Sequence, residues 1–228
     1  MPVLDREGDV YVLNLGEGEN RFNPQWIGAV NSLLDEVEAS PSPRALVVTA
    51  SGKIWSNGLD LEWLAANTSE LNPFLVEVHG LLARVLELGV PNIAALQGHT
   101  FAGGAMLALA FDRRIMRADR GYFCLPEVDI NIPFTPGMSS LIQARLGKQP
   151  AHEAMTTGRR YGGADALDSG IVQATAELDQ LLPLAIEAVS GLATKDGGTL
   201  KTIKQRMYRT TLDCLRDVEA NSISVPGL

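Results

Sequence analysis

The sequence predicts an α/β fold, in which a core of alternating strands and helices is followed by a helical C-terminal region. Short apolar runs at 45–50 and 93–96 are typical of strands buried on both faces, and amphipathic helical patterns lie between such runs. From Pro136 onward the pattern is helical. Alternation of strands with helices implies parallel pairing through right-handed crossovers.

The first elements carry their own boundary signals. Segments 3–4 and 10–15 flank Glu7-Gly8-Asp9, which predicts a hairpin. Asn23 and Pro24 supply a cap and a first helical residue, and prolines at 41 and 43 end the helix. Its apolar residues have the spacing of one buried face: Trp26, Ile27, Val30, Leu33, Leu34 and Val37.

The middle of the chain holds two strands that lead into glycine-containing turns. Strand 45–50 precedes a polar turn at 51–60, and a loop is expected from Ala65 to Pro73. Asn72-Pro73 opens the next amphipathic helix, and Gly89 and Pro91 stop it. Strand 93–96 runs into a turn at 98–104 and an apolar helix at 105–111. Further strands are predicted at 114–118 and 121–124, and helices at about 137–146, 150–157, 164–169, 178–194 and 199–217.

Composition excludes several classes of function. The chain has 228 residues, a net charge of -8, 46% hydrophobic and 20% charged residues, which is the balance of a folded globular protein. The acidity disfavours general binding to nucleic acid or to an anionic membrane. The two cysteines form no CxxC pair, so no disulfide framework, structural zinc or other metal site is expected. No signal peptide or spanning run is recognisable, so the expected location is the cytoplasm.

Two strand–turn–helix units, at 54–61 and 97–105, carry the chemical content. A helix N-terminus has unpaired N–H groups and a partial positive charge. Two such termini facing one pocket would hold one developing negative oxygen, as an oxyanion hole does. The alternative is that the glycines only permit tight packing of helix on strand. A phosphate-binding loop is disfavoured, because Gly104-Ala105 stands where that loop needs Lys followed by Ser or Thr.

Four blocks of sequence share the order and spacing of one family's signatures. They are Trp55-Ser56-Asn57-Gly58-Leu59-Asp60-Leu61; Gln97-Gly98 with Ala102-Gly103-Gly104 and Asp112; Leu125-Pro126-Glu127-Val128 with Ile132-Pro133; and Thr157-Gly158-Arg159-Arg160 with Ala164, Ala166-Leu167 and Gly170-Ile171-Val172. In this order they resemble the crotonase (enoyl-CoA hydratase/isomerase) superfamily, over roughly 46–172.

The resemblance implies a crotonase-like ββα-spiral core at 1–175 that binds an acyl-CoA thioester, and a helical oligomerisation region at 176–228. It implies that the backbone N–H groups of Leu59 and Gly103 stabilise a thioester enolate. Coenzyme A is expected as part of the substrate, with no tightly bound cofactor. A homotrimer or dimer of trimers is expected, although the apolar residues of the late helices would equally pack on their own core: Leu181, Leu182, Ile186, Val189 and Leu192.

The expected reaction depends on two positions. The family's hydratases use two glutamates, of which one matches Glu127 and the other falls on Met106, whose thioether cannot exchange protons. One carboxylate suffices for an isomerase that moves a proton from C2 to C4 of a 3-enoyl thioester. Apolar neighbours would raise the pKa of Glu127: Phe123, Leu125, Val128, Ile130, Ile132 and Phe134. A helix-capping or surface role for Glu127 is the alternative.

Candidate contacts to coenzyme A come from the two glycine turns and from a basic late helix: Lys53, Asn57, Gly58, Asp60, Leu61, Gly104, Lys201 and Lys204. For the two late lysines, the alternative is a solvated helix face. Asp129 is a spare acid, and His99 is interpreted as a pocket-wall or surface residue rather than a base. An enoyl-CoA hydratase, another enolate-forming enzyme and a non-catalytic acyl-CoA-binding homologue stay open as alternative functions.

Overall fold

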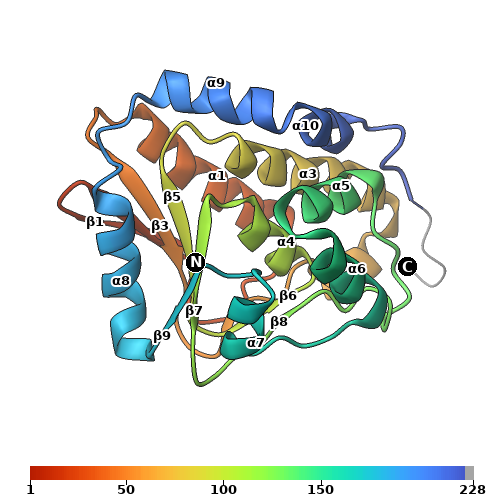
Figure 1. Ribbon diagram of the computed structural model, residues 1–228. Helices are drawn as coiled ribbons and strands as arrows, with labels where there is room; N and C mark the ends of the chain where they lie inside the picture. The colour runs from red at the N-terminus through yellow and green to blue at the C-terminus, as the bar shows by residue number, and fades with distance from the viewer. Residues whose placement is uncertain (224–228) are drawn as a thin grey trace.

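The computed structural model describes residues 1–223 and contains a large mixed sheet (Figure 1). Its strand order is β1-β2-β3-β5-β7-β9. Strands β1 and β2 pair antiparallel, and the other neighbours pair parallel. The bounds are β1 (Val3–Glu7), β2 (Val10–Asn14), β3 (Ala45–Thr49), β5 (Asn92–Leu96), β7 (Arg113–Arg117) and β9 (Ala174–Ala176). The predicted hairpin and the buried parallel strands are therefore confirmed.

A second sheet positions the two glycine turns. It consists of three short parallel strands, β4 (Ile54–Ser56), β6 (His99–Phe101) and β8 (Phe123–Cys124), in the order β4-β6-β8. Strand β4 leads into α2 (Leu61–Ala66), and β6 leads into α4 (Gly103–Ala110). Because neighbouring parallel strands end at the same edge, both glycine turns lie at one edge of this sheet.

The large sheet is covered on both faces. Along β3, Leu46 and Val48 belong to the main hydrophobic core, whereas Ala45 and Val47 face the other side, as the period of two in a strand requires. Figure 1 shows α9 (Gly197–Met207) and α10 (Arg209–Arg216) along α1 (Pro24–Ala39) and α3 (Leu71–Leu86). The remaining helices of the second half are α5 (Pro136–Arg145), α6 (Lys148–Thr157), α7 (Gly163–Asp168) and α8 (Leu178–Ser190).

Helix α8 uses its apolar residues inside the chain. Leu181 and Val189 are buried against the large sheet, and Leu182 and Ile186 pack on the same cluster. Four of the five residues considered for subunit contacts therefore pack on the chain's own core, which was the alternative to a role in oligomerisation. The fifth, Leu192, is 39% exposed. The division at residue 175 and the oligomeric state stay predictions.

Side-chain caps begin three of the helices, and the first of them was predicted from the sequence. The Asn23 side chain accepts a hydrogen bond from the Trp26 N–H, and Pro24 is the first residue of α1. Asp60 caps α2 in the same way, accepting from the Trp63 N–H. Thr135 caps α5 by accepting from the Met138 N–H. The last two caps matter for function, because each lies next to the cavity described below.

Four expectations are corrected. The segment 65–73 is not a loop, since α2, a 3₁₀ turn (Thr68–Glu70) and the start of α3 occupy it, and α3 begins at Leu71 rather than at Asn72-Pro73. The helix expected at 199–217 is two helices, with Tyr208 between them. Strands β4, β6 and β9 were not expected, and β4 lies within the predicted polar turn at 51–60. Three residues are too few for a periodic signal, and only pairing with neighbouring strands defines these elements.

Within residues 1–223, no helix has the length and apolar character that a membrane crossing requires.

Candidate active site

A cavity of about 450 Å³ opens where the two glycine turns meet the loop at 126–135 and helices α2, α3 and α5. Part of its wall is apolar, and these side chains come from segments far apart in the chain: Leu64, Leu71, Leu75, Met138 and Ile223. Another part comes from strands β4 and β6: Ile54, His99 and Phe101. The cavity therefore combines a hydrocarbon-lined section with the backbone turns of the small sheet.

The two glycine turns are in direct contact. A Cβ atom added to Gly58 would lie 2.5 Å from the backbone nitrogen of Gly103, closer than real contacts allow. A Cβ added to Gly103 would lie 2.9 Å from Leu59 Cδ1. Gly58 also has a φ of +76°, in the left-handed region that favours glycine. Both glycines thus permit the close approach that brings Leu59, the next residue after Gly58, beside the first turn of α4.

The backbone amides at this contact are free of internal partners. Phe22 pairs with the first turn, donating its N–H to the Gly58 carbonyl and accepting from the Asp60 N–H, so the intervening Leu59 N–H faces away from it. Among residues 1–223, neither the Leu59 nor the Gly103 N–H has a protein acceptor. Ala102, which precedes α4, has a φ of 51° and a ψ of -125°, a strained conformation of the kind found at functional sites.

Glu127 is the buried carboxylate of the cavity. It follows β8, is 6% exposed, and its Oε2 atom has no hydrogen-bond partner. Burial raises the pKa of Glu127 to about 7, because water no longer solvates the charged form. The Ile132 N–H donates to the Glu127 carbonyl and closes the surrounding loop. A carboxylate with this pKa can both accept and donate a proton near neutral pH.

The apolar surroundings of Glu127 differ in part from those expected. Ile130 and Ile132 line the cavity, but Val128 is 47% exposed and faces away from the core. The missing apolar surface comes from Met106 on α4, which is 2% exposed and lines the same cavity. The other lining carboxylate, Glu62, is exposed and lies 3.2 Å from Arg21. A second buried carboxylate is thus not found among the lining residues that the structure describes.

The expected coenzyme A contacts on the glycine turns fall into two groups. Asn57 and Leu61 line the cavity. The Asp60 carboxylate instead accepts from the Asn23 side-chain amide and from the Trp63 N–H, so it holds α2 in place. Gly104 packs against β4, since an added Cβ would lie 2.5 Å from the Ser56 carbonyl oxygen. Asp60 and Gly104 therefore support the shape of the turns.

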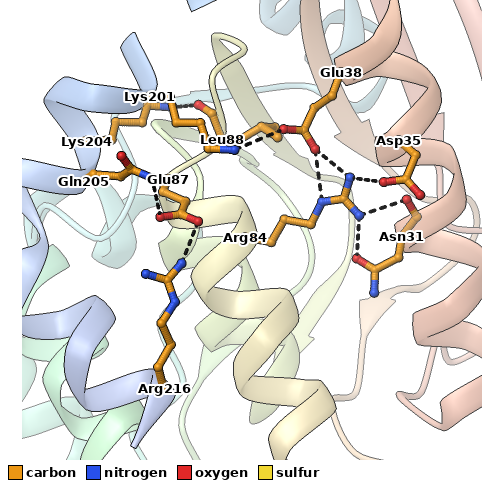
Figure 2. Close-up of polar contacts among 10 residues, drawn as sticks. All are labelled: Asn31, Asp35, Glu38, Arg84, Glu87, Leu88, Lys201, Lys204, Gln205 and Arg216. Atoms are coloured by element: carbon orange, nitrogen blue, oxygen red, sulfur yellow. Dashed lines mark hydrogen bonds and ion pairs between the residues drawn. The ribbon is translucent and has the colours of Figure 1, made fainter. Parts of the chain in front are cut away.

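The three lysines do not line this cavity. Lys53 is exposed, beside the start of β6, where its carbonyl accepts from the His99 N–H. Lys204 is 5% exposed; its Nζ donates to the Leu88 carbonyl at 2.8 Å and lies 2.6 Å from Asp112. Figure 2 shows Lys204 at the contact between α9 and the end of α3, with Lys201 pointing toward Glu38.

For Lys204, the surroundings do not fit the alternative of a solvated helix face. Lys204 holds α9 on the chain's own core, and its buried ammonium group is already occupied by internal partners. Gln205 and Arg216 bind the Glu87 carboxylate in the same contact (Figure 2). Lys201 is the more exposed of the two lysines, with Nζ 3.8 Å from Glu38. Its contact with coenzyme A stays a prediction.

Asp129, His79 and Cys124 do not have the geometry of a catalytic nucleophile or base at this cavity. Asp129 is exposed and does not line the cavity. His79 is buried, with its ring nitrogen 2.8 Å from Thr135 Oγ1, and burial lowers its pKa to about 4. Cys124 donates to the Gly158 carbonyl, and burial raises its pKa to about 11. Within the described residues, no group of three or more possible metal ligands comes together.

Sequence reasoning missed Arg21, Thr135 and most of the apolar wall. Arg21 lies just before the first helix and gave no motif, and Thr135 belongs to no motif that the sequence shows. The wall residues on α3 were predicted as a buried face, without any sign that part of this face borders a cavity.

Comparison with known proteins gives consistent matches over the whole chain. A family model described as "Enoyl-CoA hydratase/isomerase" matches residues 6–223. Enoyl-CoA delta isomerase 3 of Arabidopsis thaliana is 34% identical, over 100% of both chains. Enoyl-CoA delta isomerase 2, peroxisomal, of the same plant is 37% identical, over 77% of each chain.

Solved structures agree on the fold. Human mitochondrial delta3-delta2-enoyl-CoA isomerase is similar with a TM-score of 0.85 and 21% identity, over 93% of this chain and 84% of that one. An enoyl-CoA hydratase/isomerase family protein from Pseudomonas syringae has a TM-score of 0.89 and 24% identity, over 97% and 98% of the two chains.

Proposed function

Because the chain belongs to the enoyl-CoA hydratase/isomerase family, we propose that it is an enoyl-CoA isomerase that shifts a 3-enoyl-CoA double bond to the 2-trans position. Its fold is the crotonase-like α/β fold that the sequence predicts. Within this family, the choice of reaction depends on the groups that face the cavity, so the proposal rests on Glu127, Met106 and the two free amides.

The observation that carries the proposal is Glu127, the buried carboxylate among the described lining residues, whose Oε2 atom has no hydrogen-bond partner. In the proposed reaction, the ionised Glu127 removes a proton from C2 of the substrate. The electrons move toward the thioester carbonyl and give a dienolate, and the protonated Glu127 then returns the proton to C4. Its pKa of about 7 matches both steps, since neither form is strongly favoured near neutral pH.

The dienolate oxygen would be held by the N–H groups of Leu59 and Gly103. Two features support this role: both amides lack internal acceptors, and the Gly58–Gly103 contact brings the two turns together. The Gly103 amide also belongs to the first turn of α4, where the helix dipole favours negative charge. Loss of one such donor typically costs about 3 kcal/mol of transition-state stabilisation.

Isomerisation is favoured over hydration by the position of Met106. Hydration requires a water that is activated by one group and a proton that is delivered by another, whereas the thioether of Met106 has no proton to give and is only a weak acceptor for water. A non-catalytic acyl-CoA binder is disfavoured because a buried, unpaired carboxylate destabilises a fold and contributes nothing to holding an uncharged acyl chain.

The proposal is tested by mixing the purified protein with a 3-enoyl-CoA and recording the absorbance of the conjugated 2-enoyl thioester. Steady formation of the conjugated product supports isomerase activity. Failure to form it, together with hydration when 2-enoyl-CoA is supplied, would assign the chain to the hydratases. The cytoplasmic location stays a prediction; two relatives from Arabidopsis thaliana carry "peroxisomal" in their names.

A further inference from the structure

The cavity contains a second buried polar atom without a partner. Among the lining residues that the structure describes, two side-chain atoms are buried and lack hydrogen bonds, Glu127 Oε2 and His99 Nδ1. The proposed reaction uses the first and leaves the second unexplained. An unsatisfied buried polar atom costs about 1–3 kcal/mol, so His99 Nδ1 is expected to gain a partner when the cavity is filled.

The His99 ring is held in its place by the fold. Its residue is paired with Ile54 of β4, and its backbone N–H donates to the Lys53 carbonyl at 2.9 Å. The ring centroid lies 5.1 Å from that of Phe101 and 5.6 Å from that of Tyr122. A fixed ring presents its unpartnered nitrogen in a defined direction, as residues that orient a ligand do.

The neutral ring is suited to an uncharged polar partner. Burial lowers the pKa of His99, and the positive charges of Arg160 and Arg120 lower it further, so the imidazole is neutral at pH 7. A neutral imidazole has one N–H donor and one acceptor nitrogen. It can therefore pair with either side of an amide, an N–H or a carbonyl.

The path of the chain indicates which part of the substrate lies near His99. Strand β6 runs from His99 to the Gly103 amide, and β4 runs from Ile54 toward the Leu59 amide. The apolar wall comes from α2, α3 and α5, and α2 begins two residues after Leu59. A thioester carbonyl at the amides thus has the apolar wall on one side, which suits an acyl chain, and the His99 wall on the other, where the pantetheine arm with its two amides must leave.

We propose that His99 Nδ1 forms a hydrogen bond with an amide of the pantetheine arm and thereby contributes to binding of the thioester. This proposal rests on the proposed function, because it takes a coenzyme A thioester as the ligand. His99 acts in binding rather than in proton transfer, and the loss of its hydrogen bond should reduce affinity about tenfold, as a net contribution of about 1.4 kcal/mol does.

Three substitutions separate the ring nitrogens. His99→Phe removes both nitrogens and keeps an aromatic ring against Phe101 and Tyr122. His99→Asn keeps an amide group near the position of Nδ1, whereas His99→Gln places its amide near Nε2. His152→Phe, at an exposed position on α6, is the matched control for a His-to-Phe change. Each variant is assayed with the 3-hexenoyl thioesters of coenzyme A and of pantetheine, and its Kd for hexanoyl-CoA is measured by titration calorimetry.

The expected result is that His99→Phe and His99→Gln raise KM about tenfold for both thioesters with kcat within about twofold, while His99→Asn stays within about threefold of the wild type. His152→Phe should behave like the wild type. If His99→Phe does not fold, the Asn and Gln variants decide. A rise in KM for the coenzyme A thioester but not for the pantetheine thioester would overturn the proposal. A decrease confined to kcat, or equal rises in KM for His99→Asn and His99→Gln, would also overturn it. Calorimetry keeps the test independent of turnover, so a wild type without isomerase activity would refute the proposed function alone.

Discussion

The unusual state of Glu127 predicts that its replacement by glutamine stabilises the fold above neutral pH. A glutamate that is 6% exposed and whose Oε2 atom has no partner must lose most of its hydration in order to ionise in the folded chain. Glutamine has nearly the same shape and carries no charge. Glu127→Gln therefore removes the cost of ionisation and leaves the packing of the cavity almost unchanged.

The size of the effect follows from the pKa of Glu127, which rises from 4.5 to about 7 on folding. Below pH 4.5 the carboxyl is protonated in both states and costs nothing. Between these values the folded chain holds a proton that the unfolded chain has lost, so the stability of the wild type falls as pH rises. Above pH 7 the decrease is complete, at about 3 kcal/mol relative to the glutamine variant.

Urea unfolding of both proteins, at equal concentration and at several pH values from 5 to 8, measures this difference. Subtracting the two free energies of unfolding cancels the other titrating groups. Glu187→Gln, an exposed change on α8, is the control, and its free energy of unfolding should change with pH as that of the wild type does. A constant difference between wild type and Glu127→Gln across the range would show that Glu127 is hydrated or paired, and the reasoning on its pKa would then be refuted.

Three further changes test the site. The isomerase kcat/KM should fall about tenfold per pH unit below about 7, as Glu127 takes up a proton, and a flat profile from pH 5 to 8 would contradict its role as the base. Gly58→Ala should abolish activity and lower the melting temperature, since its Cβ would lie 2.5 Å from the Gly103 nitrogen; Gly8→Ala, also at positive φ but with nothing within 4 Å, is the control and should keep full activity. Met106→Glu should raise the hydration of 2-enoyl-CoA measurably above the wild-type level, and no increase in a folded variant would mean that a second carboxylate alone does not make a hydratase.

The sequence predicts the parts of the site that depend on local geometry. Gly58 and Gly103 follow strands and precede helices, and this order indicated two turns that could face one pocket, with tight packing of helix on strand as the alternative. The single carboxylate at Glu127 and the thioether at Met106 were likewise readable from their positions in the four blocks. The structure places all four residues at or beside one cavity.

The parts that depend on distant contacts were not predictable. The basic residues of α9 have the pattern of a solvated face, and only the fold reveals that Lys204 meets Asp112 and the Leu88 carbonyl. The apolar wall draws Leu75 and Ile223 together from positions far apart in the chain. No periodic pattern distinguishes a side chain that borders a cavity from one that packs in a core.

The most direct test of the central claim is the turnover of Glu127→Gln with a 3-enoyl-CoA. If Glu127 alone moves the proton, kcat should fall by at least about 1,000-fold while KM changes little, because the carboxylate acts on the transition state rather than on the coenzyme A arm. Circular dichroism and the Kd for hexanoyl-CoA should match the wild type. Retention of more than about a tenth of the wild-type kcat would mean that another group carries the proton, and the single-carboxylate mechanism would be wrong.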